Sequence, residues 1–119
     1  MIRRPGSRER EILWIGSSFT DFHAFSLAVR KESGYQLHRV QNDLLPEDWK
    51  ALAGLGIGVC ERRLRDSSGI SRVMYVAKFD EKIYVLQCFQ KKNQRTSSAD
   101  KEITRARYTS VQQHHRSQR

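Results

Sequence analysis

The sequence has few of the residues that build disulfide, metal or membrane proteins. Only two cysteines, Cys60 and Cys88, occur among 119 residues, so no disulfide framework is possible and we expect buried free thiols. The four histidines show no metal-ligand spacing with them, and we expect no metal or small-molecule cofactor. No apolar run reaches transmembrane length, and residues 1–10 lack the apolar segment of a signal peptide. We therefore expect a cytoplasmic protein without membrane association.

Acidic residues are also few compared with basic ones. The chain has 22 Lys and Arg against 13 Asp and Glu, which gives a formal net charge of +9 and a pI near 10.1. This excess favours polyanionic partners such as nucleic acid or the ribosome, and an acidic protein is the next candidate. The length suits a single domain with a modest core.

The chain divides by composition into an arm, a domain and a tail. Residues 1–10 carry four arginines and predict a basic N-terminal arm, residues 11–111 the domain, and residues 112–119 a polar tail. An apolar run at residues 12–15 predicts a first strand. Apolar residues then recur at helical spacing until Pro46, and a final helix is expected from Ala99 to about Val111. The helical stripe comprises Phe19, Phe22, Phe25, Val29, Leu37, Val40 and Leu44.

The middle of the chain predicts an antiparallel meander. Its three strands are Val59–Arg65, Ile70–Phe79 and Lys82–Gln90. Turn-forming residues separate them at 66–69 and 80–81. Together with the first strand, this predicts an α+β fold in which helices pack on one face of a four-stranded, mainly antiparallel sheet, followed by a C-terminal helix.

Turn lengths fix the registers, and side-chain alternation then sorts the residues into two faces. Arg63 is expected opposite Arg72, Arg72 opposite Phe89, and Met74 opposite Gln87. The predicted core face comprises Cys60, Leu64, Val73, Tyr75, Ala77, Phe79, Tyr84, Leu86 and Cys88. The other face comprises Glu61, Arg63, Arg65, Arg72, Met74, Gln87, Phe89 and Lys91.

The facing arginines point to a phosphate ligand. Like charges directly across two strands are unfavourable, whereas a phosphate between two guanidinium groups makes the pair favourable. The alternative is that Glu61 and a further carboxylate neutralise Arg63 and Arg72. Phe89 either stacks a nucleotide base or is covered by the last helix. Arg62 falls on the apolar face, where it would have to reach solvent at the strand edge or sit at a bulge.

The pattern resembles the phage-derived, HigB-like branch of the RelE/ParE toxin superfamily over about residues 11–111. The most specific matches are the strand with Arg72-Val73 and Tyr75 and the exit Phe89-Gln90-Lys91-Lys92. Further matches are Gly16-Ser17-Ser18, Gly34-Tyr35, Asp48-Trp49-Lys50, Gly58-Val59, Arg63, Arg65-Asp66, Gly69, Tyr84-Val85-Leu86 and Gln94.

The resemblance implies a type II toxin that cuts mRNA in the A site of the 70S ribosome. A cognate helix-turn-helix (HigA-like) antitoxin would hold it inactive. Cleavage would be metal-independent: the RNA 2′-hydroxyl attacks the adjacent phosphate, leaving a cyclic phosphate and a 5′-hydroxyl.

The resemblance also assigns roles to residues of this chain. Arg63 and Arg72 would clamp the scissile phosphate, with Lys91 as cationic support or general base and Glu61 as the alternative base. RNA or ribosome contacts would come from Arg65, Phe89, Lys92 and Gln87, the last at a position where the family often has His.

Two other classes of function remain open. The chain could be a ParE-like inhibitor of a protein target such as gyrase. It could also be a basic nucleic-acid-binding module that performs no catalysis.

Overall fold

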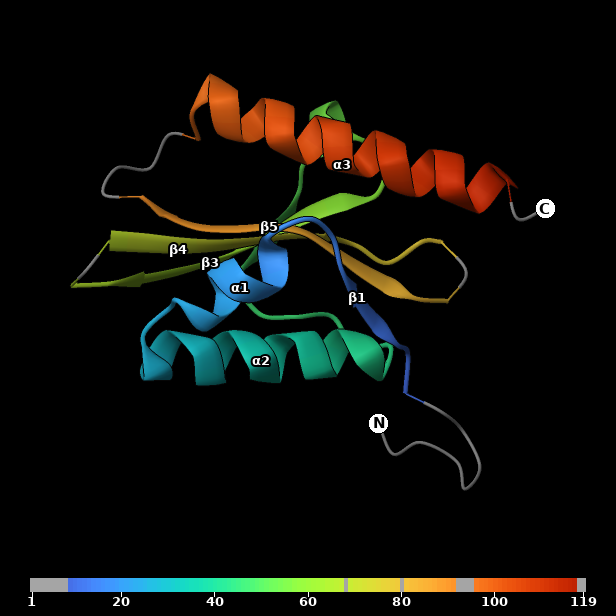
Figure 1. Ribbon diagram of the computed structural model, residues 1–119. Coiled ribbons are helices and arrows are strands. Elements are labelled where there is room, and N and C mark those ends of the chain that lie inside the picture. The colour runs from blue at the N-terminus through green and yellow to red at the C-terminus, as the bar shows by residue number, and fades with distance from the viewer. Residues whose placement is uncertain (1–8, 68, 80, 92–95, 118–119) are drawn as a thin grey trace.

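The computed structural model describes residues 9–67, 69–79, 81–91 and 96–117. The elements in chain order are β1 (Ile12–Trp14), α1 (Ser18–His23), α2 (Leu27–Gln41), β2 (Trp49–Ala51), the 3₁₀ helix η1 (Ala53–Leu55), β3 (Val59–Asp66), β4 (Gly69–Val76), β5 (Ile83–Lys91) and α3 (Ser98–Ser117). The strands form one sheet in the order β1-β5-β4-β3-β2. In Figure 1 the sheet lies between α2 on one side and α3 on the other.

The fold is α+β as predicted, but two details of the prediction were wrong. The sheet has five strands and is mixed, because β1 pairs parallel with β5 and the short edge strand β2 pairs with β3. Helices cover both faces rather than one. The three residues of β2 are all exposed, so no alternating pattern in the sequence could announce this strand.

The registers of the meander are confirmed. Arg63 pairs with Arg72 across β3 and β4, and Arg72 pairs with Phe89 across β4 and β5. A shift in register then occurs between Met74 and Tyr75. This bulge explains an error in the predicted core, because one extra residue in β5 reverses the alternation beyond it.

Both faces of the sheet are therefore core. On the α1–α2 face, Val73, Tyr75, Val85 and Cys88 pack with Phe22, Phe25, Val29, Leu37 and Val40. On the α3 face, Met74, Val76, Phe79, Tyr84 and Leu86 pack with Tyr108 and Val111. Phe79, Tyr84 and Leu86 thus lie opposite to their predicted face, while Met74, expected on the polar face, is buried.

The helices also differ in extent from the prediction. The expected continuous helical region is interrupted between His23 and Leu27, where Ser26 caps α2 by accepting a hydrogen bond from the Val29 amide at 3.3 Å. The last helix continues to Ser117, beyond the expected end at Val111. Within the described ranges, no helix has both the length and the apolar character to cross a membrane.

Contacts between the η1 region and Tyr108 hold the middle of α3 in place. Gly56 follows η1 with φ 152°, and a Cβ there would lie 2.6 Å from the Tyr108 ring. The Tyr108 hydroxyl donates a hydrogen bond to the Ile57 carbonyl at 2.8 Å. This packing fixes the distance between the β2–η1 segment and the first turns of α3, which form the walls of the site described next.

Candidate functional site: a basic cleft

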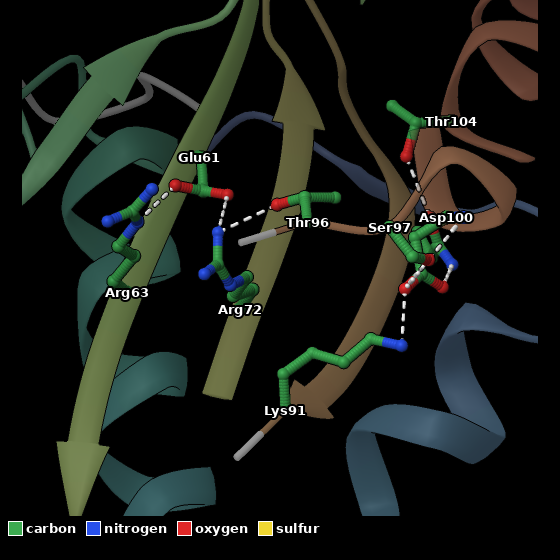
Figure 2. Close-up of polar contacts among 9 residues, drawn as sticks. Glu61, Arg63, Arg72, Lys91, Thr96, Ser97, Asp100 and Thr104 are labelled. Carbon is green, nitrogen blue, oxygen red and sulfur yellow. Dashed lines mark hydrogen bonds and ion pairs between the residues drawn. The ribbon is translucent and has the colours of Figure 1, made fainter. Parts of the chain in front are cut away.

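A buried carboxylate joins the two facing arginines. Figure 2 shows Glu61 of β3 between the guanidinium groups of Arg63 and Arg72. Arg72 Nη1 donates to Glu61 Oε2 at 2.9 Å and to Thr96 Oγ1 at 2.8 Å, and Arg63 Nε donates to Glu61 Oε1. Neutralisation by Glu61 and a further carboxylate was the predicted alternative to a phosphate ligand. The structure shows Glu61 paired with both arginines. This cluster of two guanidinium groups and one carboxylate has a net charge of +1.

The three side chains differ in access to solvent. The side chains of Glu61 and Arg72 have no exposed surface, whereas that of Arg63 is 34% exposed. Arg63 is therefore the member of this cluster that an incoming anion meets. Burial of the other two is tolerated because each charge has an opposite partner within hydrogen-bonding distance.

Arg63 lies in an open cleft of about 570 Å³ between the β2–η1 segment and the start of α3. The lining residues are Lys50, Leu52, Gly54, Leu55, Glu61, Arg63, Thr96, Lys101 and Arg105. Four of them are cations, of which Arg105 is also paired with Glu102 of α3 at 2.7 Å, and Glu61 is the only carboxylate among the lining residues that the structure describes. A second hollow of about 370 Å³ shares Lys50, Glu61 and Arg63 and adds Asp48, Trp49 and Arg65. The two hollows share three lining residues, and we refer to them together as the basic groove. A surface rich in cations of this kind attracts phosphate groups.

Three cations of this groove were missed by sequence reasoning. Lys50 lies on the unrecognised strand β2, and Lys101 and Arg105 lie one turn apart on α3. The spacing of Lys101 and Arg105 places both on one face of a helix, which was a usable signal. Nothing in the sequence indicated that this face borders Arg63.

The remaining predicted site residues lie elsewhere. Lys91 Nζ contacts Asp100 Oδ2 at 2.7 Å rather than lining the groove, and Figure 2 shows it pointing toward α3. Phe89 is half-buried and packs against the core under α3, with Lys91 Nζ 5.9 Å from its ring centroid. Arg65 is exposed and lines the second hollow. Lys92, another predicted contact, lies outside the described residues.

Gln87 belongs to a polar network that attaches α3 to β5. Its Nε2 donates to Asp100 Oδ1 at 3.2 Å, and its Oε1 accepts from Thr104 Oγ1 at 2.7 Å. Ser97 Oγ also donates to Asp100 at 2.8 Å. Burial alone would raise the pKa of Asp100, but hydrogen bonds from Lys91, Ser97 and Gln87 outweigh it and hold this pKa below its ordinary value. The network therefore anchors the helix that carries Lys101 and Arg105.

The cysteines lie in the sheet as unmodified thiols. Burial raises the pKa of the Cys60 thiol and raises that of Cys88 to about 12. Thiols so far from ionisation are poor nucleophiles. In the part of the chain that the structure describes, no three His, Cys, Asp or Glu side chains gather into a group that could hold a metal ion.

Arg62, expected to reach solvent or sit at a bulge, is instead buried and ion-paired. Its Nη2 lies 3.1 Å from Glu32 Oε1 of α2, and its Nη1 donates to the Arg63 carbonyl. This arginine therefore faces α2, on the side of the sheet away from the basic cleft.

Comparison with protein families gives a match over most of the chain. Residues 20–109 match the model of a family described as phage-derived protein Gp49-like (DUF891). The matched range contains the cluster around Glu61, the groove cations and most of α3. Searches of curated proteins and of solved structures gave no match.

Proposed function

The chain belongs to the phage-derived Gp49-like family, a RelE/toxin-like family, and from this premise we propose that it is the toxin of a type II toxin–antitoxin system. Its activity would be ribosome-dependent cleavage of mRNA. One observation carries the proposal: a cleft lined by Lys50, Arg63, Lys101 and Arg105, in which the one carboxylate of the described lining, Glu61, is already bound to two guanidinium groups. Such a groove attracts the phosphates of a single strand.

The chemistry proposed for the groove needs charge stabilisation and proton transfer. The 2′-hydroxyl attacks the adjacent phosphorus, the bond to the 5′-oxygen breaks, and a cyclic phosphate and a 5′-hydroxyl result. Arg63 would stabilise the additional negative charge on the phosphate oxygens, because its guanidinium is the exposed part of the cluster. Lys50, Lys101 and Arg105 would hold the flanking phosphates.

Proton transfer has two candidates, Lys91 and Glu61. Glu61 is fully buried and accepts hydrogen bonds from two guanidinium groups, which suits a supporting role. Lys91 is 34% exposed and lies beside Asp100. Because Lys91 is paired with Asp100 and is absent from the described lining of the groove, a role in proton transfer would require its side chain to leave Asp100.

The proposal extends to the branch of the toxin family and to the binding partners, an antitoxin and the ribosome. The matches around Arg72-Val73 and Lys91 support the HigB-like branch, whose toxins are paired with a helix-turn-helix antitoxin. An antitoxin that covered the groove would block RNA entry. The ribosome would supply further contacts to the basic surface, for which Arg65 is the exposed candidate on β3.

The test is cleavage of a translated message by purified ribosomes with the purified protein, read by primer extension. Arg63→Ala should reduce cleavage about 10²- to 10³-fold, the usual cost of removing one contact to a transition-state charge. Arg116→Ala, at the other end of α3, removes the same charge away from the groove and should cleave like the parent. Equal cleavage by both variants would remove Arg63 from the site.

A second candidate is an RNA-binding module that does not cleave. It is favoured by the burial of Arg72 and its pairing with Glu61, which leave Arg63 as the exposed charge of the cluster. Growth arrest on expression without mRNA cleavage would support this candidate. Arrest with altered DNA supercoiling would instead support a protein target such as gyrase.

A further inference from the structure

Glu61 is placed unusually for a groove that binds anions. It lines both hollows, yet its side chain has no exposed surface, and each carboxylate oxygen accepts a hydrogen bond from a different arginine. Arg72, by contrast, is absent from the described lining of either hollow and is fully buried. The order from the protein interior to the groove is therefore Arg72, Glu61, Arg63.

We infer that Glu61 is a positioning residue that sets how strongly the groove binds RNA, and that Arg72 acts through Glu61 rather than on the RNA. The inference rests on the proposed function only in taking RNA as the ligand. Glu61 holds the guanidinium of Arg63 through its Nε, which leaves the outer nitrogens for a phosphate. At the same time, the negative charge of Glu61 repels the phosphate that Arg63 binds.

This arrangement separates affinity from orientation. Without the negative charge of Glu61, the groove would bind any phosphate more strongly. Without the hydrogen bond to Glu61, however, the Arg63 side chain would lose its fixed orientation. Arg72 holds the Glu61 carboxylate in place, because a buried carboxylate needs a charged or hydrogen-bonding partner. The cluster therefore presents one positively charged group with a fixed orientation, Arg63, to the groove.

The decisive variant is Glu61→Gln, which keeps the size and one hydrogen-bond acceptor but removes the charge. Binding of a short fluorescein-labelled single-stranded RNA to the purified protein, read by anisotropy at low salt, should tighten about threefold to tenfold, the effect of removing one like charge some 6 Å away in a largely aqueous medium. Glu32→Gln is the matched control, because it makes the same charge change beside Arg62 on the opposite side of the sheet. Its affinity should stay within about twofold of the parent, since a distant charge is screened.

A double variant keeps the inference testable if Glu61→Gln fails to fold. Glu61→Gln with Arg72→Gln removes both charges of the buried pair, so the groove keeps the net charge of the parent. Its RNA affinity should lie within about twofold of the parent. Circular dichroism and thermal unfolding confirm that each variant compared is folded.

Three results would overturn the inference. Unchanged affinity in Glu61→Gln would make Glu61 a purely structural residue, and weakened affinity would show that its charge is needed for binding. A loss of about tenfold or more in the double variant would show that Arg72 itself contacts the RNA. None of these outcomes depends on cleavage, so a protein that binds RNA without cutting it would leave the inference standing.

Discussion

Arg62 and Arg72 are both buried in the central strands, but their surroundings differ. Arg62 faces α2 and pairs with Glu32, one positive charge to one negative. Arg72 shares Glu61 with Arg63, two positive charges to one negative, and this cluster borders an open cleft with three further cations. The balanced pair has no charge left to bind a ligand, whereas the unbalanced cluster does. Charge balance, rather than burial, separates the structural arginine from those of the candidate site.

Exposure of the partner carboxylates also differs. The Glu32 side chain is 40% exposed, whereas that of Glu61 has no exposed surface. Water can therefore replace Arg62 as the partner of Glu32, but cannot easily replace Arg72 as a partner of Glu61. The two arginines should consequently differ both in their contribution to stability and in their effect on activity.

The largest expected loss of stability comes from introducing a buried charge that has no partner. Val73 is 2% exposed, lies beside Arg72 on β4 and faces the α1–α2 core. Val73→Asp should cost more than about 4 kcal/mol and unfold the domain, measured by urea denaturation. Val73→Ala, which introduces no charge, should cost only about 2 kcal/mol. A cooperatively folded aspartate variant would show that this face is not a closed core.

The comparison itself is tested by truncating each arginine. Arg72→Ala should cost about 3 to 5 kcal/mol of unfolding free energy, because it removes one of two charged partners of a fully buried carboxylate. Arg62→Ala should cost about 1 to 2 kcal/mol, since Glu32 can turn to solvent. Only Arg72→Ala should also reduce mRNA cleavage, through loss of the Glu61 support for Arg63. Equal costs in denaturation would contradict the distinction drawn from exposure.

A smaller effect is expected from pH, through the network that anchors α3. The pKa of Asp100 is held below its ordinary value in the folded chain, so Asp100 stabilises the fold at pH values above that ordinary value, about 3.9. This contribution is lost as the pH falls through the lowered pKa of the folded state. Urea denaturation at pH values from 7 downward should therefore show a loss of stability on acidification that is smaller in Asp100→Asn. The exposed Glu102→Gln is the control, and an unchanged acid response in Asp100→Asn would exclude this network as its source.

Sequence alone predicted the part of the site that local rules control. The length of the turn between β3 and β4 predicted the register that pairs Arg63 with Arg72. Side-chain alternation then placed Glu61 on the same face of the sheet as both arginines. The bulge beyond Met74 had no such signal, so Tyr84 and Leu86 of β5 were assigned to the wrong face, whereas Tyr75 of β4 was assigned correctly. The cleft could not be predicted either, because Lys50, Lys101 and Arg105 meet only when η1 and α3 pack through Gly56 and Tyr108. Contacts of this kind depend on tertiary packing rather than on periodicity.

The central claim, that the unbalanced charge of the groove binds RNA phosphates, is tested most directly by the salt dependence of RNA affinity. Lys101→Ala with Arg105→Ala removes two groove cations, and Arg30→Ala with Lys31→Ala removes two cations from α2. The slope of log affinity against log salt should fall in magnitude by about 0.7 for each lost phosphate contact in the groove variant and stay at the parent value in the α2 variant. Equal slopes in the two variants would contradict the claim, because RNA would then respond to net charge and not to the groove.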